Sequence, residues 1–200
     1  MTDLVAHPGP DWVVAEMPPG YETRLSEIQR LITDLNAMNR FARLLTELGA
    51  RLAESVCDAF TAMKFETELV EGPAESLVAV RLDGNRRLLL IPSSSSGPVQ
   101  KKGAELTEVF RVLQEVAGDP DRVVLVTNVD PETRPADRPP AIAPDALALL
   151  ARMGVIHFPA SALFKLWKLS FQGMDRARAQ VERLHAADPG TFELPASALR

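Results

Sequence analysis

Four consecutive aliphatic residues, Leu88 to Ile91, follow two arginines and run without a polar interruption into Pro92 and the serine segment Ser93–Ser96. A short apolar run of this kind is typical of a strand that is buried on both faces of a sheet. Proline has no amide hydrogen for the sheet ladder, so the strand must end or bulge at Pro92. The chain is therefore organised around one buried strand that leads directly into a polar loop.

The same patterns predict the elements on either side of this strand. Apolar alternation or apolar runs predict further strands over 64–70, 76–82, 122–128 and 155–158. Apolar faces at helical spacing predict helices over 21–63, 103–118, 144–153, 159–167 and 175–186. Asp83-Gly84-Asn85 predicts a hairpin turn, because Asp-Gly supplies the positive-φ positions that such a turn needs. The helix over 103–118 predicts a right-handed parallel crossover, and the whole order predicts an α/β sandwich with a mixed central sheet.

The first long helical segment carries a seven-residue apolar repeat. One seam position contains Ile28, Leu35 and Ala42, and the other contains Leu31, Met38 and Leu45. Three such heptads are typical of a short coiled coil, so we expect residues 23–45 to mediate self-association as a homodimer. One amphipathic helix packed on its own domain gives the same pattern and stays open as the alternative. Gly49 is unfavourable inside a helix and indicates a break before a second helix that ends at Met63.

These assignments divide the chain into four parts. We expect an irregular arm rich in Pro and Gly over 1–20, an N-terminal helix over 21–43, an α/β domain over 44–190 and a tail over 191–200. The single cysteine, Cys57, excludes an intrachain disulfide and is expected to be a core thiol. No apolar run reaches the roughly 18 residues of a membrane helix and no signal peptide is visible. We therefore expect a cytoplasmic protein with no membrane partner.

The net charge of −5 speaks against a protein that coats nucleic acid non-specifically and favours a protein partner. Two local groups of basic residues are nevertheless candidates for binding phosphate and stacking bases. The first group contains Arg86, Arg87, Lys101 and Lys102. The second contains Trp167 and Lys168, with Lys165, Arg176, Arg178, Arg183 and Phe171 nearby in the sequence. An ordinary solvated surface gives the same pattern. His7, His157 and His185 are too scattered in the sequence for a metal site, and His157 is expected at a sheet edge or in the core.

Several stretches resemble the PD-(D/E)XK nuclease superfamily, which has the restriction-endonuclease-like fold. Leu44–Glu54 is similar to the helix that opens many bacterial members, and Asp83–Ile91 is similar to the hairpin that delivers the catalytic strand. The later segments of the family are matched, in order, by Gly97-Pro98-Val99, Glu105-Leu106, Val126-Thr127-Asn128, Arg138-Pro139-Pro140 and Ser161–Leu166. The resemblance covers roughly residues 44–190.

The resemblance implies a metal-dependent nuclease only where the family's acids and lysine are present. One acid stands at the start of the second strand, and an acid and a lysine two residues apart stand at the end of the third; the acids hold Mg²⁺. This chain has Ser76 at the first position and Pro92-Ser93-Ser94 at the second. No acid occurs between Asp83 and Glu105. The resemblance therefore implies the fold without the chemistry, and hence no cofactor.

Three hypotheses for function follow. We expect a catalytically inactive, dimeric binding or scaffold module for a protein partner. The first alternative is a Mg²⁺-dependent DNA nuclease with migrated catalytic residues, for which Glu75, Glu105 and Lys101 are the candidates. The second alternative is a nucleic-acid-binding module that does not cleave. We expect Glu105 and Glu108 to be ordinary solvated charges at a helix start, which disfavours migration.

Overall fold

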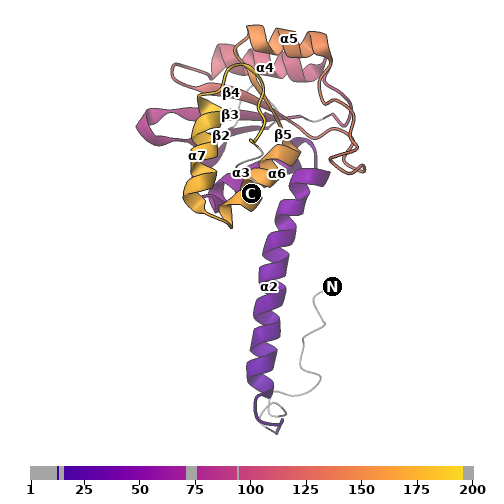
Figure 1. Cartoon of the computed structure of the whole chain (residues 1–200), viewed down its shortest axis with the longest axis vertical. Helices are drawn as coiled ribbons and strands as arrows, with labels where there is room; N and C mark the ends of the chain where they lie inside the picture. Colours follow the sequence, from indigo (N-terminus) through magenta and orange to yellow (C-terminus); the bar gives the residue numbers. More distant parts are fainter. Residues whose placement is uncertain (1–12, 14–15, 71–75, 94, 196–200) are drawn as a thin grey trace. The chain divides into compact units, whose positions relative to one another are not determined.

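The computed structural model describes residue 13 and residues 16–70, 76–93 and 95–195. The chain divides into two compact units, Met1–Arg40 and Phe41–Arg200. The first unit holds most of helix α2, and the second holds the last turns of α2, helices α3 to α7 and the described strands (Figure 1). None of the helices in the described part of the chain combines the length and apolarity needed to cross a bilayer.

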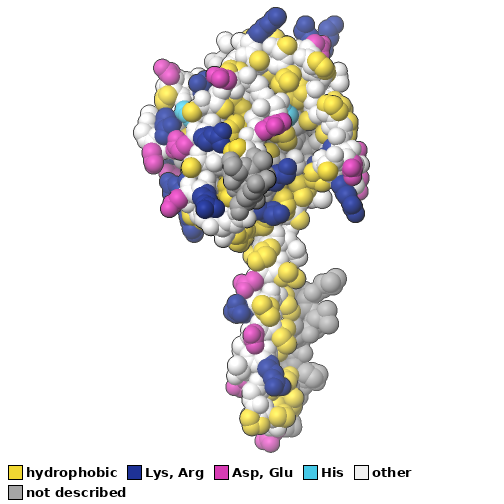
Figure 2. All heavy atoms as spheres, viewed as in Figure 1, with side chains coloured by type: hydrophobic (Ala, Val, Ile, Leu, Met, Phe, Trp, Pro, Cys, Tyr) yellow, Lys and Arg dark blue, Asp and Glu magenta, His cyan; other side chains and the backbone are white. Residues whose placement is uncertain are grey.

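Helix α2, Tyr21–Thr46, confirms the predicted N-terminal helix. It ends shortly before Gly49, which begins α3, Gly49–Ala62, with a φ of 54°. A positive φ is readily adopted by glycine, so this residue marks the predicted break between the two helices. Hydrophobic side chains lie exposed along α2 (Figure 2).

The second unit is built on a six-stranded sheet in the order β1-β2-β3-β4-β5-β6. Strand β2 is antiparallel to both β1 and β3, and β3 to β6 are parallel to one another. Helix α4, Ala104–Glu115, provides the predicted crossover between β3 and β4. The strands are β1 Glu66–Val70, β2 Leu77–Arg81, β3 Arg87–Pro92, β4 Arg122–Thr127, β5 Ile156–Pro159 and β6 Gly190–Thr191. The mixed α/β architecture predicted from the sequence is confirmed.

Helices cover both faces of this sheet, so β3 is buried on both sides (Figure 1). Leu88 and Leu90 belong to the core that contains α3, α6 (Ala160–Ser170) and α7 (Met174–His185). Leu89 and Ile91 belong to the core beneath α4 and α5 (Pro144–Arg152). All four side chains are fully buried, and each stabilises the fold by about 1.5–3 kcal/mol relative to exposure. The uninterrupted aliphatic run follows from this two-sided burial.

The predicted hairpin between β2 and β3 is present with a different distribution of backbone angles. Asp83–Asn85 form a short 3₁₀ turn, and Leu82 N–H donates to Arg86 O at 2.8 Å. The left-handed residues are Gly84, with φ 75°, and Asn85, with φ 61°. Glycine and asparagine tolerate this region better than other residues, so the turn moves by one position from the expected Asp-Gly pair.

The prediction of a tail over 191–200 is wrong for its first residues. Gly190–Thr191 form β6, which pairs in parallel with β5, and Phe192 N–H donates to His157 O at 2.8 Å. The Phe192 ring packs edge-on against Phe158 with centroids 5.6 Å apart. A strand of two residues is too short to show a periodic pattern, so the sequence did not predict β6. The segment is held in place by the packing of the Phe192 ring.

His157 lies in β5 and is buried. Of the two locations that the sequence predicted, a sheet edge or the core, the structure shows the core. Its Nε2 is 2.8 Å from Thr127 Oγ1, and its Nδ1 is 3.0 Å from Thr191 Oγ1. The two hydroxyl groups satisfy both ring nitrogens of a neutral imidazole. Burial lowers the pKa of His157 from 6.5 to about 4, because the charged form loses its hydration.

The low pKa of His157 predicts a loss of stability in mild acid. The unfolded chain takes up the proton at about pH 6.5 and the folded chain only near pH 4, so stability is complete above pH 6.5 and falls as pH drops toward 4. The loss amounts to about 3 kcal/mol. We expect urea unfolding at pH 7, 5 and 4 to show a loss that is larger by this amount in the wild type than in His157→Gln. Equal losses in the two proteins would contradict this assignment.

Candidate functional site

The parallel strands β3, β4 and β5 all end at one edge of the sheet, which we call the carboxyl edge. Pro92 pairs with Val126 in β4, and Thr127 pairs with Pro159 in β5. Because β2 is antiparallel to β3, its first residue, Leu77, lies at this edge as well. Polar groups that follow these strands are therefore collected in one place, where open α/β sheets commonly bind ligands.

Ser93 and Glu105 lie together at the carboxyl edge, and both are buried. Ser93 Oγ is 3.5 Å from Glu105 Oε1 and also accepts a hydrogen bond from Ser95 N–H at 3.2 Å. Glu105 is in the first turn of α4, where the helix dipole favours a negative charge. Only 6% of Glu105 is exposed. The expectation that this glutamate is a solvated surface charge is wrong, because the loop after β3 folds back over it.

Gly103 leaves the room that the Glu105 carboxylate occupies. A Cβ atom at position 103 would lie 2.7 Å from Glu105 Oε2 and 3.1 Å from Gln100 O. The backbone carbonyl cannot easily move away, so a side chain at this position would displace the carboxylate. Burial of Glu105 thus depends on a glycine two residues before it.

A network of hydrogen bonds from Asn128 and Arg138 closes the neighbouring part of the edge. Asn128 Nδ2 donates to Glu47 O at 2.8 Å, and Arg138 Nη2 donates to Leu45 O at 2.7 Å. Arg138 also donates to Asn128 Oδ1 and, at 2.9 Å, to Thr133 O. The guanidinium therefore ties the loop after β4 to the C-terminal end of α2, whose unpaired carbonyl groups need such donors.

The backbone of the same region is also paired across the edge. Gly49 N–H donates to Ser93 O at 3.0 Å, and Ser93 N–H donates to Val126 O at 2.8 Å. Proline at position 92 costs no ladder bond to β2, because that pairing ends at Val78 and Leu90. The polar groups around Ser93 are thus bonded within the protein.

Comparison with known proteins gives a match at the level of structure. No family model matches the chain, and no curated protein matches it either. The structure of the restriction endonuclease FokI bound to DNA is similar to it, with a TM-score of 0.52 and 11% sequence identity. The match covers 77% of this chain and 30% of that one. The chain has a restriction-endonuclease-like fold.

Two of the positions at which the sequence resemblance implies metal-binding acids, Ser76 and Pro92, lie at the carboxyl edge. Ser76 stands half-buried directly before β2, and Pro92 is the last residue of β3. Glu75 and Ser94 lie outside the described residues. Within the described ranges, no group of three or more His, Cys, Asp and Glu residues could hold a metal ion. In these ranges Glu105 is thus the candidate acid that the fold brings beside the end of β3.

The first group of basic candidates is split between the two ends of β3. Lys101 and Lys102 are exposed in the turn before α4, on the side of the carboxyl edge. Arg86 and Arg87 stand at the start of β3, a strand of six residues and so roughly 20 Å long. The structure does not bring these four side chains together as one site.

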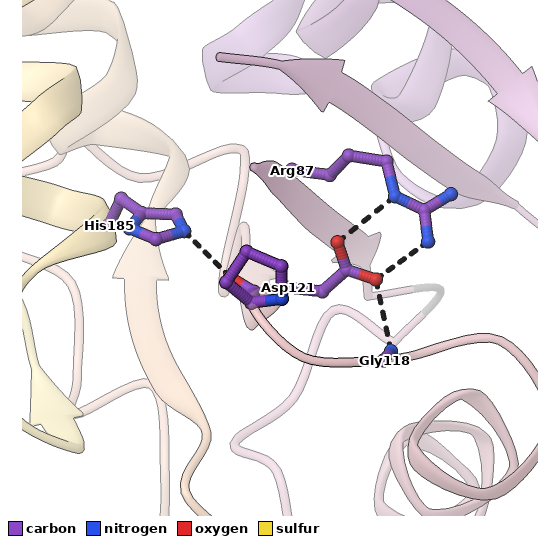
Figure 3. A network of polar contacts seen from close by, with 5 residues as sticks. Arg87, Gly118, Asp121 and His185 are labelled. Atoms are coloured by element: carbon purple, nitrogen blue, oxygen red, sulfur yellow. Dashed lines mark hydrogen bonds and ion pairs between the residues drawn. The ribbon is translucent and has the colours of Figure 1, made fainter. Parts of the chain in front are cut away.

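Arg86 and Arg87 line a cavity of about 380 Å³ at the opposite edge of the sheet. Arg87 makes a two-pronged ion pair with Asp121, at 2.6 and 3.0 Å (Figure 3). Arg86 pairs with Glu182 at 2.8 Å, and Arg81, which also lines the cavity, pairs with Glu66 at 2.9 Å. Since a carboxylate already matches each guanidinium, the cavity offers little net positive charge.

The ion pair between Arg87 and Asp121 is partly shielded from water. Burial by itself raises the pKa of Asp121, but hydrogen bonds from Arg87 and Gly118 outweigh it and lower the pKa below its ordinary value. The hydrogen bond to Asp121 raises the pKa of Arg87. His185 Nε2 lies 3.0 Å from Pro120 O, and burial lowers the pKa of this imidazole (Figure 3). The network joins β3, the loop before β4 and α7.

In the second basic candidate group, Trp167 is packed within the protein and Lys168 is exposed. Trp167 is 6% exposed and stacks on Phe41, with centroids 4.3 Å apart, while Phe164 and Phe171 contact its ring from other sides. Its indole is therefore not available to stack on a base, which corrects the expectation for this residue. Lys168 is exposed on the same helix, α6. Cys57 packs beside the core, as expected, with Sγ 3.0 Å from Thr67 Oγ1.

We expect Arg138→Met to lower the free energy of unfolding by about 1–2 kcal/mol, because it leaves partly buried carbonyl groups without their charged donor. Chemical denaturation measures this loss directly. Arg134→Met is the matched control, since Arg134 is exposed in the same loop. Equal effects of the two substitutions would show that the hydrogen bonds of Arg138 contribute nothing.

Proposed function

We propose that the chain is a catalytically inactive protein with a nuclease-like fold that acts as a dimeric binding or scaffold module for a protein partner. The proposal that the protein is catalytically inactive rests on the residues found at the carboxyl edge. Its polar groups are hydrogen-bonded within the protein, and Pro92-Ser93 stands where the resemblance implies a metal-binding acid. A serine hydroxyl cannot supply the negative charge with which carboxylates hold Mg²⁺.

A metal-dependent nuclease is the second candidate, and the position of Glu105 is the observation that favours it. Its carboxylate lies beside Ser93 at the end of β3, close to where a migrated acid would act. A single carboxylate provides few of the oxygen ligands that a divalent cation requires, and Ser93 Oγ donates its hydrogen bond to it. The inactive alternative is therefore the better supported one.

A cleavage assay separates the two candidates. We expect the wild type to leave labelled duplex, branched and single-stranded DNA intact in Mg²⁺, Mn²⁺ or EDTA, because the described residues of the edge provide too few metal ligands. Glu105→Gln should behave identically. Cleavage that requires the metal, stops in EDTA and disappears in Glu105→Gln would overturn the proposal and establish a migrated catalytic acid.

The apolar face of α2 supports the dimer. Five large hydrophobic side chains within eleven residues are 39–59% exposed, which is unusual on a monomer surface. These residues are Ile28, Leu31, Ile32, Leu35 and Met38. The spacing of seven residues from Ile28 to Leu35, and from Leu31 to Met38, places them on one face of the helix.

A second copy of the chain is the protein partner that this face supports best. Packing of knobs into holes requires the same seven-residue repeat on both helices, and a second copy has that repeat by identity. The net charge of −5 favours a protein over nucleic acid as the main partner. The dimer interface would then be isologous, with the same residues on both sides.

We expect the wild type to be a dimer in light scattering coupled to size-exclusion chromatography. Ile28→Ser with Leu35→Ser should give a monomer, since each substitution removes an apolar side chain from the seam. Gln29→Ser with Asn36→Ser is the matched control, with the same spacing on another face of α2, and should remain dimeric. A wild type that is monomeric at every concentration tested would refute self-association.

A further inference from the structure

The C-terminal half of α6 carries a cavity of about 260 Å³ that the proposed function does not use. It is lined by Lys165, Lys168, Leu169 and Gln172. The lining includes two ammonium groups and no acid, and no salt bridge joins either lysine to another described residue. In contrast to the arginine-lined cavity at the start of β3, this one has an unmatched positive charge and so favours an anion.

A third basic side chain lies beside this cavity. The carbon atoms of Arg176 pass 3.6–3.9 Å from the point where a Cβ of Gly173 would stand, directly after Gln172. Arg176 is exposed, as is Asp175, the acid nearest to it in the sequence. Three basic residues against one acid leave this part of the surface positive within an acidic chain. Several Lys and Arg side chains are visible on the face that carries α6 and α7 (Figure 2).

An exposed aromatic ring stands one helical turn beyond Lys168. Phe171 is 64% exposed, the largest exposed fraction among the described large hydrophobic residues. Its inner side packs edge-on against Trp167, with centroids 5.0 Å apart and the ring planes at 89°. Trp167 is itself held by Phe41 and Phe164. The ring of Phe171 is thus supported by a packed aromatic cluster while most of its surface faces solvent.

Two ammonium groups and an adjacent exposed ring match the chemistry of a nucleic-acid strand. Lys165 and Lys168 are three residues apart on one helix, so they are neighbours on its surface and can contact phosphates of the same backbone. An aromatic face stacks on bases, but only on bases that are not paired in a duplex. A lone exposed phenylalanine would be ordinary. Its position three residues after Lys168 makes the two side chains neighbours on the helix surface, and we take them together as one site.

We propose that the C-terminal half of α6 binds single-stranded nucleic acid, with Lys165 and Lys168 on the backbone phosphates and Phe171 stacked against an unpaired base. This assigns a ligand beyond the proposed function and involves neither the carboxyl edge nor the face of α2. Helix α6 begins directly after β5 ends, so Lys168 is roughly 12 Å along the helix from the carboxyl edge. Binding here needs no metal and no cleavage.

The test measures binding of a fluorescein-labelled strand of about 20 thymidines to the full chain by anisotropy, over a range of salt concentrations with EDTA present. We expect the single strand to bind more tightly than a duplex of the same length. Phe171→Leu should weaken binding about 10-fold, in line with the stacking of one base. Lys165→Gln with Lys168→Gln should reduce the slope of log K against log salt by about 1.4, as expected for two lost phosphate contacts.

Two matched controls separate this site from general surface effects. Phe110→Leu changes another exposed phenylalanine, on α4, and Arg134→Gln with Arg152→Gln removes two other exposed basic side chains. We expect both to bind the strand as the wild type does, and thermal unfolding should show that every variant is folded. These readouts do not depend on the oligomeric state or on nuclease activity, so the outcomes for the proposed function remain separate.

Three results would overturn the proposal. The first is no binding of the single strand by the wild type even at low salt. The second is an equal loss in the α6 variants and in the controls, which would indicate non-specific attraction. The third is displacement of the strand by adenosine monophosphate at equal nucleotide concentration, which would assign the cavity to a free nucleotide.

Discussion

Leu88 and Leu90 point to one helical layer while Leu89 and Ile91 point to the other, so β3 cannot leave the middle of the sheet without exposing apolar surface on both sides. This constraint fixes the neighbours of the strand. The hairpin brings β2 to one side, and the crossover through α4 brings β4 to the other. The carboxyl edge follows from it, because β4 and β5 run in the same direction as β3 and end at the same side of the sheet.

At the carboxyl edge, the described polar groups contribute to the stability of the fold. A nuclease needs exposed carboxylates at this edge, and their mutual repulsion must be offset by a bound cation. Here donors and acceptors meet each other: Asn128 and Arg138 bond to backbone oxygens, and Gly49 bonds to Ser93. Among the described residues, this edge therefore carries little electrostatic repulsion.

The sequence pattern was sufficient for the helices and for strands β1 to β5, but not for β6 or for the site. A strand that is buried on both faces is visible in the sequence as a continuous aliphatic run, as in β3. A helix that packs on a core is visible as apolar residues that recur every three to four positions. The burial of Glu105 has no such sequence pattern, because it depends on the path of a loop and on the absence of a side chain at Gly103. Trp167 and Phe171 differ by about one turn of α6, and only the packing of Phe41 shows which ring is covered.

The hydrogen bonds that end α2 have a consequence for how the sequence can vary. Asn128 and Arg138 contact the main-chain oxygens of Glu47 and Leu45 and not their side chains. Positions 45 and 47 are therefore free to change identity while the attachment persists, whereas positions 128 and 138 are not. In an alignment of distant homologues, we expect residue identity to vary at positions 45 and 47 and to be retained at positions 128 and 138.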